Sequence, residues 1–381
     1  MKQAATGTPS EMSNNVWLPG QHCPELDGVR GIAIIMVTLY RFFKEVDPAA
    51  HPLLAFAHRI SPIGERGVDL FFVLSGFLIT GILLQSKSKA GYFRNFFVRR
   101  SLRIFPLYFT ALLICLFLIP MLFGTTVFAK PRSEQAYLWT YLTNFRMSWL
   151  NEWCFGPLDH FWSLAVEEHF YFAWPVIVFV LPTRALLRLS LGIIVVVGIA
   201  RTVAATRSEL DVAVDVLTFF RCDSLCFGAV LAILINQGIS SKTIEKVAKW
   251  TLPWMLLIAI GIAIRGNRLL TIPNSLCPAI WAILMAFLLT RTREHLLSRT
   301  FRSKALRWFG KYSYGMYVFQ LPLVSLLTMS LFKEYFGVFT NDPFAINVAY
   351  VATMLLLTSF LAYISYHGFE KHFLKLKNKW H

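Results

Sequence analysis

Two arginines lie eleven residues apart in the first apolar segment, ELDGVRGIAIIMVTLYRFFKE, with no charge between them. In an α-helix, Arg30 and Arg41 would fall on one face, roughly 16 Å apart along the axis. Charges inside a membrane helix are costly, usually face the bundle interior and often mark functional sites. The pair therefore predicts that this helix contributes to a site. The alternative is that each arginine reaches lipid headgroups at one of the two interfaces.

A second pair of arginines opens another apolar segment, FFVRRSLRIFPLY. Arg100 and Arg103 are three residues apart and share a helix face. Guanidinium groups bind phosphate or pyrophosphate in a bidentate manner, so this pair predicts an anion site. The alternative is a positive stop signal at the cytoplasmic entrance, which suits Arg99 better than the deeper Arg103. Pro106 is expected to perturb the first turns of this helix.

The segment DHFWSLAVEEHFYFAWP is dense in polar groups for a membrane-embedded stretch. His160 and Glu167 are two turns apart at similar azimuths, and Glu167 and Tyr171 are spaced i,i+4. A histidine beside a carboxylate can act as a general base, with the carboxylate orienting the ring. The adjacent acids Glu167 and Glu168 precede a fully apolar run, which favours a functional role. The alternative is an interfacial helix start, where the dipole favours acids.

Four further charges are predicted to support these groups. Asp69 is expected to neutralise a buried arginine from another helix, and Arg221 and Asp223 to pair with other members of the network. Structural pairing is at least as good an account of these three as catalysis. Glu370 ends the last apolar segment and is expected to contact the cytoplasmic arginines. The sequence contains no nucleotide-binding glycine loop and no metal motif, so no metal is predicted.

Composition identifies the class of protein. Of 381 residues, 56% are hydrophobic, above the roughly 45–50% typical of soluble domains. The chain carries 37 Lys and Arg against 21 Asp and Glu, a net charge of +16. In a membrane protein, the positive-inside rule explains this excess without a nucleic-acid partner. The six cysteines lack zinc or redox spacing, so no disulfide framework is expected.

The predicted fold class is an all-α integral membrane protein, a polytopic bundle of about ten transmembrane helices. The first and fourth spans are the least apolar and are predicted to be buried inside the bundle, away from lipid. The ten spans are 29–46, 66–84, 102–123, 162–181, 187–205, 214–235, 250–265, 273–290, 312–332 and 346–366.

Lysine and arginine are distributed roughly two to one between alternate connections, which predicts that both termini are cytoplasmic. This count places Arg201 in an outside connection. We expect a polar tail at 1–25, a transmembrane domain at 26–370 and a basic tail at 371–381, with no internal repeat. The outside connection 124–161 is expected to lie on the membrane or to stack on a sugar, because it and the next span carry Trp139, Trp149, Trp153 and Trp162.

Several segments together resemble the membrane acyltransferase 3 family, which includes bacterial O-antigen, exopolysaccharide and peptidoglycan O-acetyltransferases. The resemblance runs from about Glu25 to Lys375, in the family order. It implies ten transmembrane helices with cytoplasmic termini, an acyl-CoA donor reached from the cytoplasm, and an acceptor hydroxyl at or beyond the outer face. The segments are LDGVRGIAIIMV, GVDLFFVLSGFLIT, RRSLRIFPLYF, HFWSLAVEEHFYF, RCDSLCFGAVLA and GKYSYGMYVFQLPL.

The resemblance also implies roles for individual residues. The family has an arginine, ten residues and then a histidine proposed as the catalytic base; Arg30 matches the arginine, and Arg41 stands in place of the histidine. Gln320 occupies a place where a late-span histidine is often found. The family's paired arginines, and its Trp-Ser-Leu and acidic motif, fall on Arg100, Arg103, Trp162, Ser163, Leu164, Glu167 and Glu168.

Arg41 changes what can be expected of the chemistry, because arginine stays protonated and cannot take a proton from a hydroxyl at neutral pH. Losing a general base typically removes ~10²–10⁴-fold of rate. Three explanations stand. The chain is an inactive variant, His160 has become the base, or Arg41 stabilises an acyl-transfer oxyanion while proximity carries slow chemistry.

The leading hypothesis is a multi-pass O-acyltransferase of the bacterial inner membrane. It would move an acyl group, with acetyl as the first candidate, from acyl-CoA to a hydroxyl of a surface carbohydrate or lipid-linked sugar. Position 41 would be the chemical centre. Arg30 would orient or neutralise charge, Arg100 and Arg103 would hold the CoA phosphates, and His160 and Glu167 would position the acceptor or relay a proton.

Besides acyl-CoA, the carbohydrate and the lipid bilayer, no bound cofactor and no nucleic acid are expected, and no oligomeric state is predicted. The alternative is a non-catalytic family member or a transporter-like binding protein. The polar network expected to support the site comprises Asp69, Ser75, Trp162, Ser163, Glu168, Tyr171, Arg221, Asp223 and Glu370.

Overall fold

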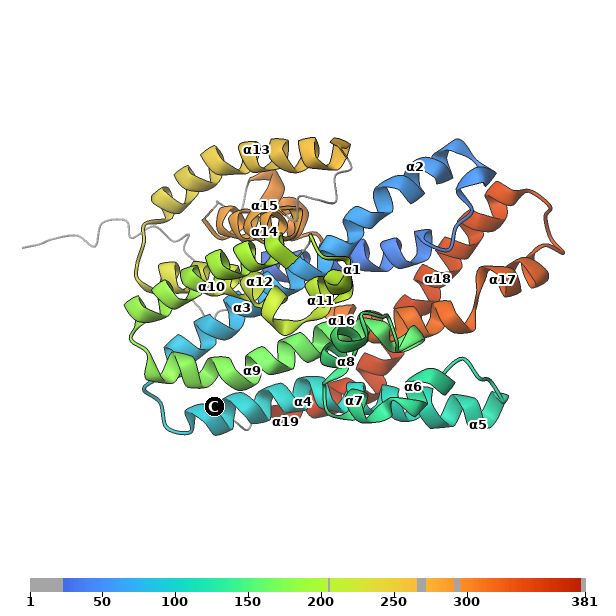
Figure 1. Ribbon diagram of the computed structural model, residues 1–381, viewed down its shortest axis with the longest axis horizontal. Helices are drawn as coiled ribbons and strands as arrows, with labels where there is room; N and C mark the ends of the chain where they lie inside the picture. Colours follow the sequence, from blue (N-terminus) through green and yellow to red (C-terminus); the bar gives the residue numbers. More distant parts are fainter. Residues whose placement is uncertain (1–22, 205, 266–271, 291–294, 378–381) are drawn as a thin grey trace, which may run out of the picture.

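The computed structural model describes residues 23–204, 206–265, 272–290 and 295–377, and within these ranges the chain is helical and contains no β-strand (Figure 1). The predicted tail 1–25 therefore lies outside the described residues except for 23–25, whereas most of the predicted tail 371–381 is described and forms helix α19. The α-helices are α1 Pro24–Phe43, α2 Pro52–Ile60, α3 Gly67–Ser86, α4 Tyr92–Leu113, α5 Ile119–Phe123, α6 Ala129–Ser133, α7 Gln135–Trp139, α8 Thr143–Leu150, α9 Trp162–Val180, α10 Thr183–Ala204, α11 Asp211–Val216, α12 Thr218–Asn236, α13 Ser241–Arg265, α14 Ile272–Thr290, α15 Leu296–Phe301, α16 Lys304–Leu326, α17 Met329–Phe336, α18 Pro343–Ser365 and α19 Lys371–Leu376.

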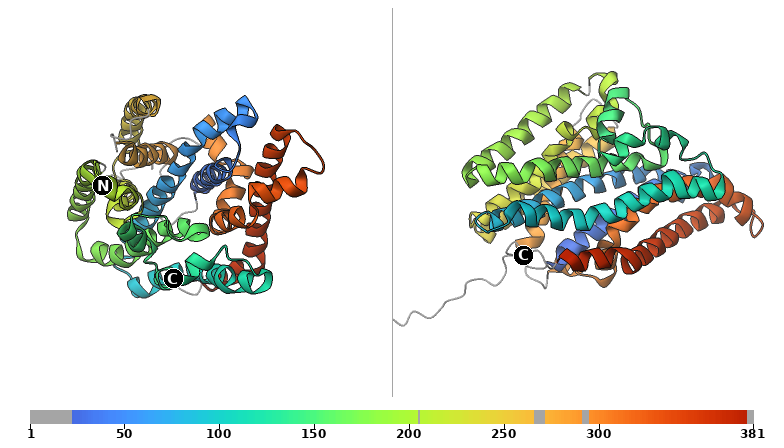
Figure 2. Two further views of the ribbon diagram at one scale, coloured as in Figure 1. Left: turned by 45° about the vertical axis from the view of Figure 1, so that its right-hand side comes forward. Right: turned by 90° about the horizontal axis from the view of Figure 1, so that it is seen from below.

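The long helices run beside one another, and the short helices α2, α5 to α7 and α17 gather toward one end (Figures 1 and 2). Within the described residues, six stretches are long and apolar enough to cross a membrane, or seven if the bent pair α16–α17 is one span. The prediction of an all-α multi-pass membrane protein is confirmed at this level, and the count of ten spans stays a prediction. The six stretches are Pro52–Ser86, Tyr92–Phe123, Gly156–Val180, Thr183–Ala204, Ser208–Asn236 and Pro343–Leu376.

Helix α1 lies inside the bundle, as predicted for the first span. None of its residues from Pro24 to Phe43 is exposed. The prediction for the fourth span is only partly right. Helix α9 belongs to the least apolar of the six stretches, but its apolar window is 50% buried, against 72% for the stretch containing α3 and 67% for that containing α12. Apolar helices are therefore buried more deeply than α9.

Glycines let two pairs of helices meet backbone to backbone. A Cβ on Gly31 would overlap the backbone of Leu306, and one on Gly310 would overlap the carbonyl oxygen of Asp27, so α1 and α16 touch directly. Helices α3 and α12 meet in the same way, with Gly76 against Leu225. Small residues are the usual means of close helix contact in membranes. These contacts fix α1 against α16 and α3 against α12.

Helix α4 begins well before the predicted start of the third span. Gly91 has a φ of +74°, in the left-handed region that glycine tolerates, and α4 starts at the next residue. Arg100 and Arg103 thus lie in mid-helix, and Pro106 sits inside a continuous helix. The expectation that Pro106 perturbs the first turns is wrong, because those turns lie further back. A π-helical turn at Ile114–Leu118 follows instead.

Two predicted spans are each divided into two helices, and one predicted connection is folded into short helices. The span 312–332 bends by 67° between α16 and α17, where the Thr328 side chain accepts from Leu331 N and begins a new helix. The span 214–235 is interrupted at Leu217, whose extended backbone separates α11 from α12. The connection 124–161 folds into α6, α7, α8 and a 3-10 helix, Gly156–Phe161.

Candidate active site

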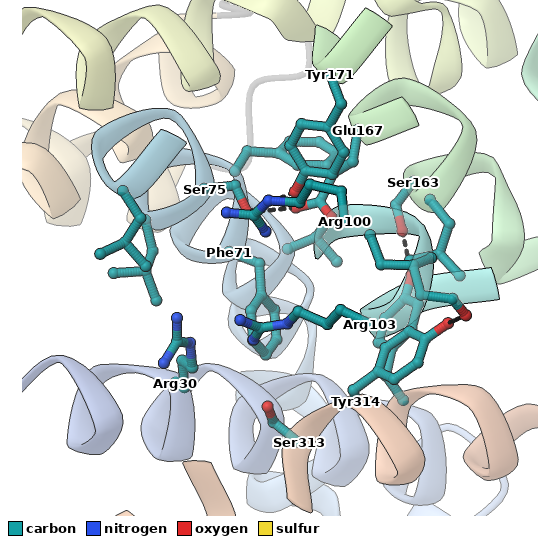
Figure 3. A pocket seen from close by; sticks show the side chains of 17 residues that line it. Arg30, Phe71, Ser75, Arg100, Arg103, Ser163, Glu167, Tyr171, Ser313 and Tyr314 are labelled. Atoms are coloured by element: carbon teal, nitrogen blue, oxygen red, sulfur yellow. Dashed lines mark hydrogen bonds between the residues drawn. The ribbon is translucent and has the colours of Figure 1, made fainter. Parts of the chain in front are cut away.

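Five helices, α1, α3, α4, α9 and α16, surround a cavity of about 800 Å³, including the part open to solvent (Figure 3). Four of its walls, from α1, α3, α4 and α9, carry residues predicted from the sequence, whereas the wall from α16 was not predicted. The polar groups that line the cavity are Arg30, Ser75, Arg100, Arg103, Ser163, Glu167, Tyr171, Ser313, Tyr314 and Tyr317.

The cavity has a cationic side. Figure 3 shows the guanidinium groups of Arg30, Arg100 and Arg103 approaching the same space from α1 and α4. Arg30 pairs with Asp27 at 3.2 Å, and Arg100 lies 5.1 Å from the ring centre of Tyr171. Among the described residues, neither Arg100 nor Arg103 forms an ion pair with a carboxylate within 4.0 Å. These two charges are therefore available to an anionic ligand.

An acid faces the cations from α9. Ser75 donates a hydrogen bond of 2.6 Å to Glu167 Oε1, and Tyr171 donates to Ser75 Oγ at 3.3 Å. Glu167 and Tyr171, predicted to lie together from their spacing, are joined through this serine of α3. The carboxylate is thus oriented by a serine of α3 that Tyr171 holds in turn, and orientation is what a proton acceptor or a substrate-positioning group needs.

Tyr317 of α16 lines the cavity and is hydrogen-bonded to α9 and to the 3-10 helix that precedes it. Its hydroxyl lies 2.5 Å from Ser163 Oγ and donates to the backbone carbonyl of His160 at 2.8 Å. The His160 ring does not line the cavity, is 1% exposed, and has no hydrogen-bond partner for either nitrogen among the described residues. The structure does not bring His160 and Glu167 together: His160 belongs to the 3-10 helix before α9 and lies outside the cavity lining, whereas Glu167 accepts from Ser75 inside the cavity.

Arg41 also lies outside the cavity lining, although it was predicted to share a face with Arg30. Its guanidinium interacts electrostatically with His160, Tyr317 and Asp159, and sits 5.2 Å from the ring centre of Tyr40. The two arginines therefore occupy different environments. Arg30 faces the cavity, whereas Arg41 lies beyond Tyr317.

The predicted charge pairing of Asp69 is confirmed. Arg221 of α12 contacts Asp69 of α3 at 3.2 Å, and both side chains are nearly fully buried. Arg66, which was not foreseen, adds a contact to Asp69 at 3.6 Å. The Trp162 ring lies 5.2 Å from the Arg221 guanidinium, so Trp162 is a buried packing residue and does not belong to the interfacial tryptophans. Trp149, by contrast, is 84% exposed.

A second buried ion pair joins Arg201 to Asp223 at 2.8 Å, with both side chains fully buried. The assignment of Arg201 to an outside connection is wrong. Its helix α10 extends to Ala204, and the guanidinium turns inward to α12. Ser275 of α14 completes this cluster by accepting from Arg201 Nη1 at 3.0 Å and donating to Asp223 Oδ2 at 3.2 Å.

The remaining predicted acids lie at the edges of the site. Glu370 accepts from Ser365 Oγ at 2.9 Å and interacts electrostatically with Arg103, in keeping with its expected contact to the cytoplasmic arginines. Glu168 does not line the cavity. Its Oε1 is buried without a partner among the described residues.

Sequence reasoning missed the wall from α16. Ser313, Tyr314 and Tyr317 bring three hydroxyls to the cavity, and Tyr314 also donates to the Ile104 carbonyl of α4 at 2.7 Å. The sequence feature that could have predicted this wall is the group of hydroxyl side chains near the start of the otherwise apolar span 312–332. In the described ranges, no group of three or more His, Cys, Asp or Glu could hold a metal ion.

Comparison with known proteins gives one family. A family model described as an acyltransferase domain matches residues 24–364. Peptidoglycan O-acetyltransferase OatA of Listeria monocytogenes is 26% identical over 328 residues, covering 81% of this chain and 50% of the relative. Putative peptidoglycan O-acetyltransferase YrhL of Bacillus subtilis is 26% identical, covering 92% of this chain and 55% of the relative.

A putative O-acetyltransferase of Staphylococcus aureus (strain COL) is 24% identical, covering 81% of this chain and 51% of the relative. The chain thus spans about half the length of the curated relatives it matches. No solved structure matches.

Proposed function

The chain belongs to this acyltransferase family, and from that premise we propose that it transfers an acyl group from acyl-CoA to a hydroxyl of a surface carbohydrate. Acetyl is the first candidate for the acyl group, because the printed names of the relatives describe O-acetyltransferases. The observation that carries the proposal is the cavity, in which Arg30, Arg100 and Arg103 face an acid and several hydroxyls.

The donor would bind at the cationic side. Coenzyme A carries phosphate and pyrophosphate groups, and Arg100 and Arg103 lack carboxylate partners among the described residues. Guanidinium groups make strong, paired hydrogen bonds to such groups. Arg30, already paired with Asp27, would orient the donor and offset its charge. The acyl thioester would then extend toward Ser163 and Tyr317.

The transfer step forms one bond and breaks one. The acceptor oxygen attacks the thioester carbonyl carbon, a C–O bond forms, the C–S bond breaks, and coenzyme A leaves. The acceptor proton passes to a base and then to the departing sulfur. Glu167, held by Ser75, is the proposed proton acceptor within the cavity, since Arg41 stays protonated. The hydroxyls of Ser163 and Tyr317 are the proposed donors to the oxyanion, which would draw their protons away from each other and from the His160 carbonyl.

The proposed setting is the cytoplasmic membrane of a bacterium, with about ten spans and both described ends on the cytoplasmic side. The distribution of lysine and arginine supports this orientation. The acceptor hydroxyl would then approach from the opposite face, as a sugar of a surface polymer or a lipid-linked precursor.

The donor assignment can be tested with purified protein and radiolabelled acetyl-CoA. Arg100→Ala and Arg103→Ala should each weaken donor binding by about tenfold to a hundredfold, as expected for charged hydrogen bonds. Arg59→Ala, an exposed arginine of α2, is the matched control and should bind as the unaltered protein does. Unchanged binding in both cavity variants contradicts the donor assignment.

A second candidate is a binding protein of this family that does not catalyse transfer. It is favoured by Arg41, which cannot act as a base. Arg41→His separates the two. Acyl transfer that appears only in Arg41→His marks a disabled enzyme, and equal transfer in both proteins places the base elsewhere. Donor binding without transfer in either protein supports the binding role.

A further inference from the structure

A second polar region lies beyond Tyr317, outside the cavity. Four elements contribute buried polar atoms that lack a hydrogen-bond partner among the described residues: α1, the 3-10 helix Gly156–Phe161, α16 and α18. Apart from Arg41, none of the side chains is more than 1% exposed. The atoms are Thr38 Oγ1, Arg41 Nε, both ring nitrogens of His160, both amide atoms of Gln320, and Thr358 Oγ1.

The packing of α1 against α16 shows which residues of the two helices lie at the same height along the bundle. The two helices start together, where Gly310 meets Asp27, and they remain together to the other end, where Phe42 and Val324 belong to one apolar cluster. They therefore run in parallel, and Arg41 comes level with Gln320. Thr38 lies one turn back on α1.

The other two elements meet α16 at this level too. Helix α18 runs antiparallel to α16, since Gly315 faces Ala362 and Tyr350 donates to the Leu327 carbonyl. Thr358 is therefore level with Gln320. The His160 ring centre lies 5.2 Å from that of Tyr317, one turn before Gln320.

Charge is what distinguishes this region. No carboxylate of the described residues lies within ion-pair distance of Arg41. Asp159 interacts with it electrostatically, but its Oδ1 already accepts from Phe155 N at 2.7 Å. A buried polar atom without a partner costs free energy, and the half-buried charge of Arg41 has no anion beside it. A bound anion that also accepts hydrogen bonds would offset both the cost and the charge.

We infer that Arg41, Gln320 and His160 form a subsite for a carboxylate carried by one of the two substrates. A carboxylate matches the planar guanidinium in two parallel hydrogen bonds and can accept further bonds from an amide and an imidazole N–H. This inference rests on the proposed acyl transfer and names a substrate class for it. The substrate is acidic, and Arg41 selects it.

The carboxylate can come from either substrate. A donor seated on Arg100 and Arg103 points its acyl end at Tyr317, so the free carboxylate of a dicarboxylic acyl group would reach past Tyr317 toward Arg41. An acidic sugar entering from the other face would present its carboxylate to the same residues. Both sources share one recognition chemistry, and binding measurements separate them.

The experiment uses the full chain in lipid nanodiscs and two pairs of probes. The donor pair is acetyl-CoA and succinyl-CoA, and the acceptor pair is methyl glucoside and methyl glucuronide. In at least one pair, the acidic member should bind roughly tenfold to a hundredfold more tightly than the neutral one. The pair that discriminates identifies the source of the carboxylate.

Variants assign the preference to Arg41. Arg41→Gln should abolish it, Arg41→Lys should keep only part of it because the fork geometry is lost, and Arg59→Gln should leave it intact. Acetyl-CoA binding to Arg41→Gln shows that this variant is folded, because the donor arginines lie elsewhere. If Arg41→Gln does not fold, the partial loss of the preference for the acidic probe in Arg41→Lys tests the same assignment.

Two results would overturn the inference: equal binding of acidic and neutral members in both pairs, or a preference that survives Arg41→Gln. Either result leaves the proposed function standing if acetyl-CoA still binds through Arg100 and Arg103. A protein that binds no acyl-CoA at all contradicts the proposed function itself.

Discussion

The bundle contains two sets of interior arginines that differ in what faces them. Arg201 and Arg221 meet the carboxylates of Asp223 and Asp69 at 2.8 and 3.2 Å, and all four side chains are nearly fully buried. The cavity arginines are partly exposed, and among the described residues Arg103 has no carboxylate within 4.0 Å. The first set joins helices, whereas we propose that the second binds an anionic ligand. On that proposal, the same residue type serves stability in one region and binding in the other.

The largest effect is expected from breaking the α10–α12 pair. Asp223→Ala would leave Arg201 buried without an anion and should destabilise the fold by about 3–5 kcal/mol. Unfolding of the purified protein in detergent measures this loss. The double variant Arg201→Met with Asp223→Leu should recover much of the stability, because no charge is then stranded. If Asp223→Ala is as stable as the unaltered protein, the Arg201–Asp223 pair is not structural and the two sets of arginines do not differ in this way.

The opposite pattern is expected in the cavity. Arg103→Met should weaken acetyl-CoA binding by about 1.5–3 kcal/mol, the range for a hydrogen bond to a charged group, and leave unfolding unchanged or slightly improved. Binding and unfolding are measured on the same preparation, with Arg59→Met as the control. If Arg103→Met unfolds as readily as Asp223→Ala, then Arg103 is structural and the comparison fails.

A smaller effect is expected from the acid opposite the cations. Ser75→Ala removes the 2.6 Å hydrogen bond to Glu167, a contact worth about 1 kcal/mol, and should slow acyl transfer by roughly fivefold to tenfold. The loss should fall on kcat, with KM for acetyl-CoA little changed. Ser133→Ala, an exposed serine of α6, is the control. A change in KM alone would assign Ser75 to donor binding.

The smallest effect concerns pH. Burial lowers the pKa of Lys377 to about 8, and the neighbouring Arg103, Arg99, Arg100 and Arg30 add to this shift. Lys377 therefore loses its proton as pH rises from 7 to 9, and a positive charge near the donor site disappears. Acetyl-CoA affinity should fall over this range by up to about fivefold, the scale of a partly exposed charge pair. Lys377→Gln should bind more weakly at pH 7 and show no such fall.

Much of the fold could be predicted from composition and local pattern. Hydrophobic runs predict the long helices. Polar residues within those runs predict the cavity, because a charge inside a membrane helix is costly and usually marks a functional site. Arg30, Glu167 and Tyr171 were found in this way. Spacing on one helix also placed Arg30 and Arg41 on a common face, but it could not show that Tyr317 of another helix separates their surroundings.

The features that were missed depend on contacts between distant segments. Arg201 lies near the end of its helix, so from the sequence it was assigned to a connection. Its partner Asp223 lies on α12, and this contact between separate helices cannot be read from local sequence. The early start of α4 depends on a left-handed glycine, and the break at Leu217 on extended backbone in an apolar run. Neither the start of α4 nor the break at Leu217 changes the pattern of apolar residues, so the sequence pattern does not predict them. His160 was linked to Glu167 by azimuth, which assumed one continuous helix where a 3-10 turn precedes α9.

The glycine contacts between α1 and α16 also bear on ion leakage. Where Gly310 meets Asp27 there is no room for a methyl group, and so none for a file of water molecules. Protons cross membranes along such files, so a seam this tight would insulate the bundle beside a cavity that carries several charges. On the proposed function, it would let charged substrates bind within the bilayer while the electrochemical gradient is preserved. Gly310→Ala would test the seal, measured as proton leakage in liposomes.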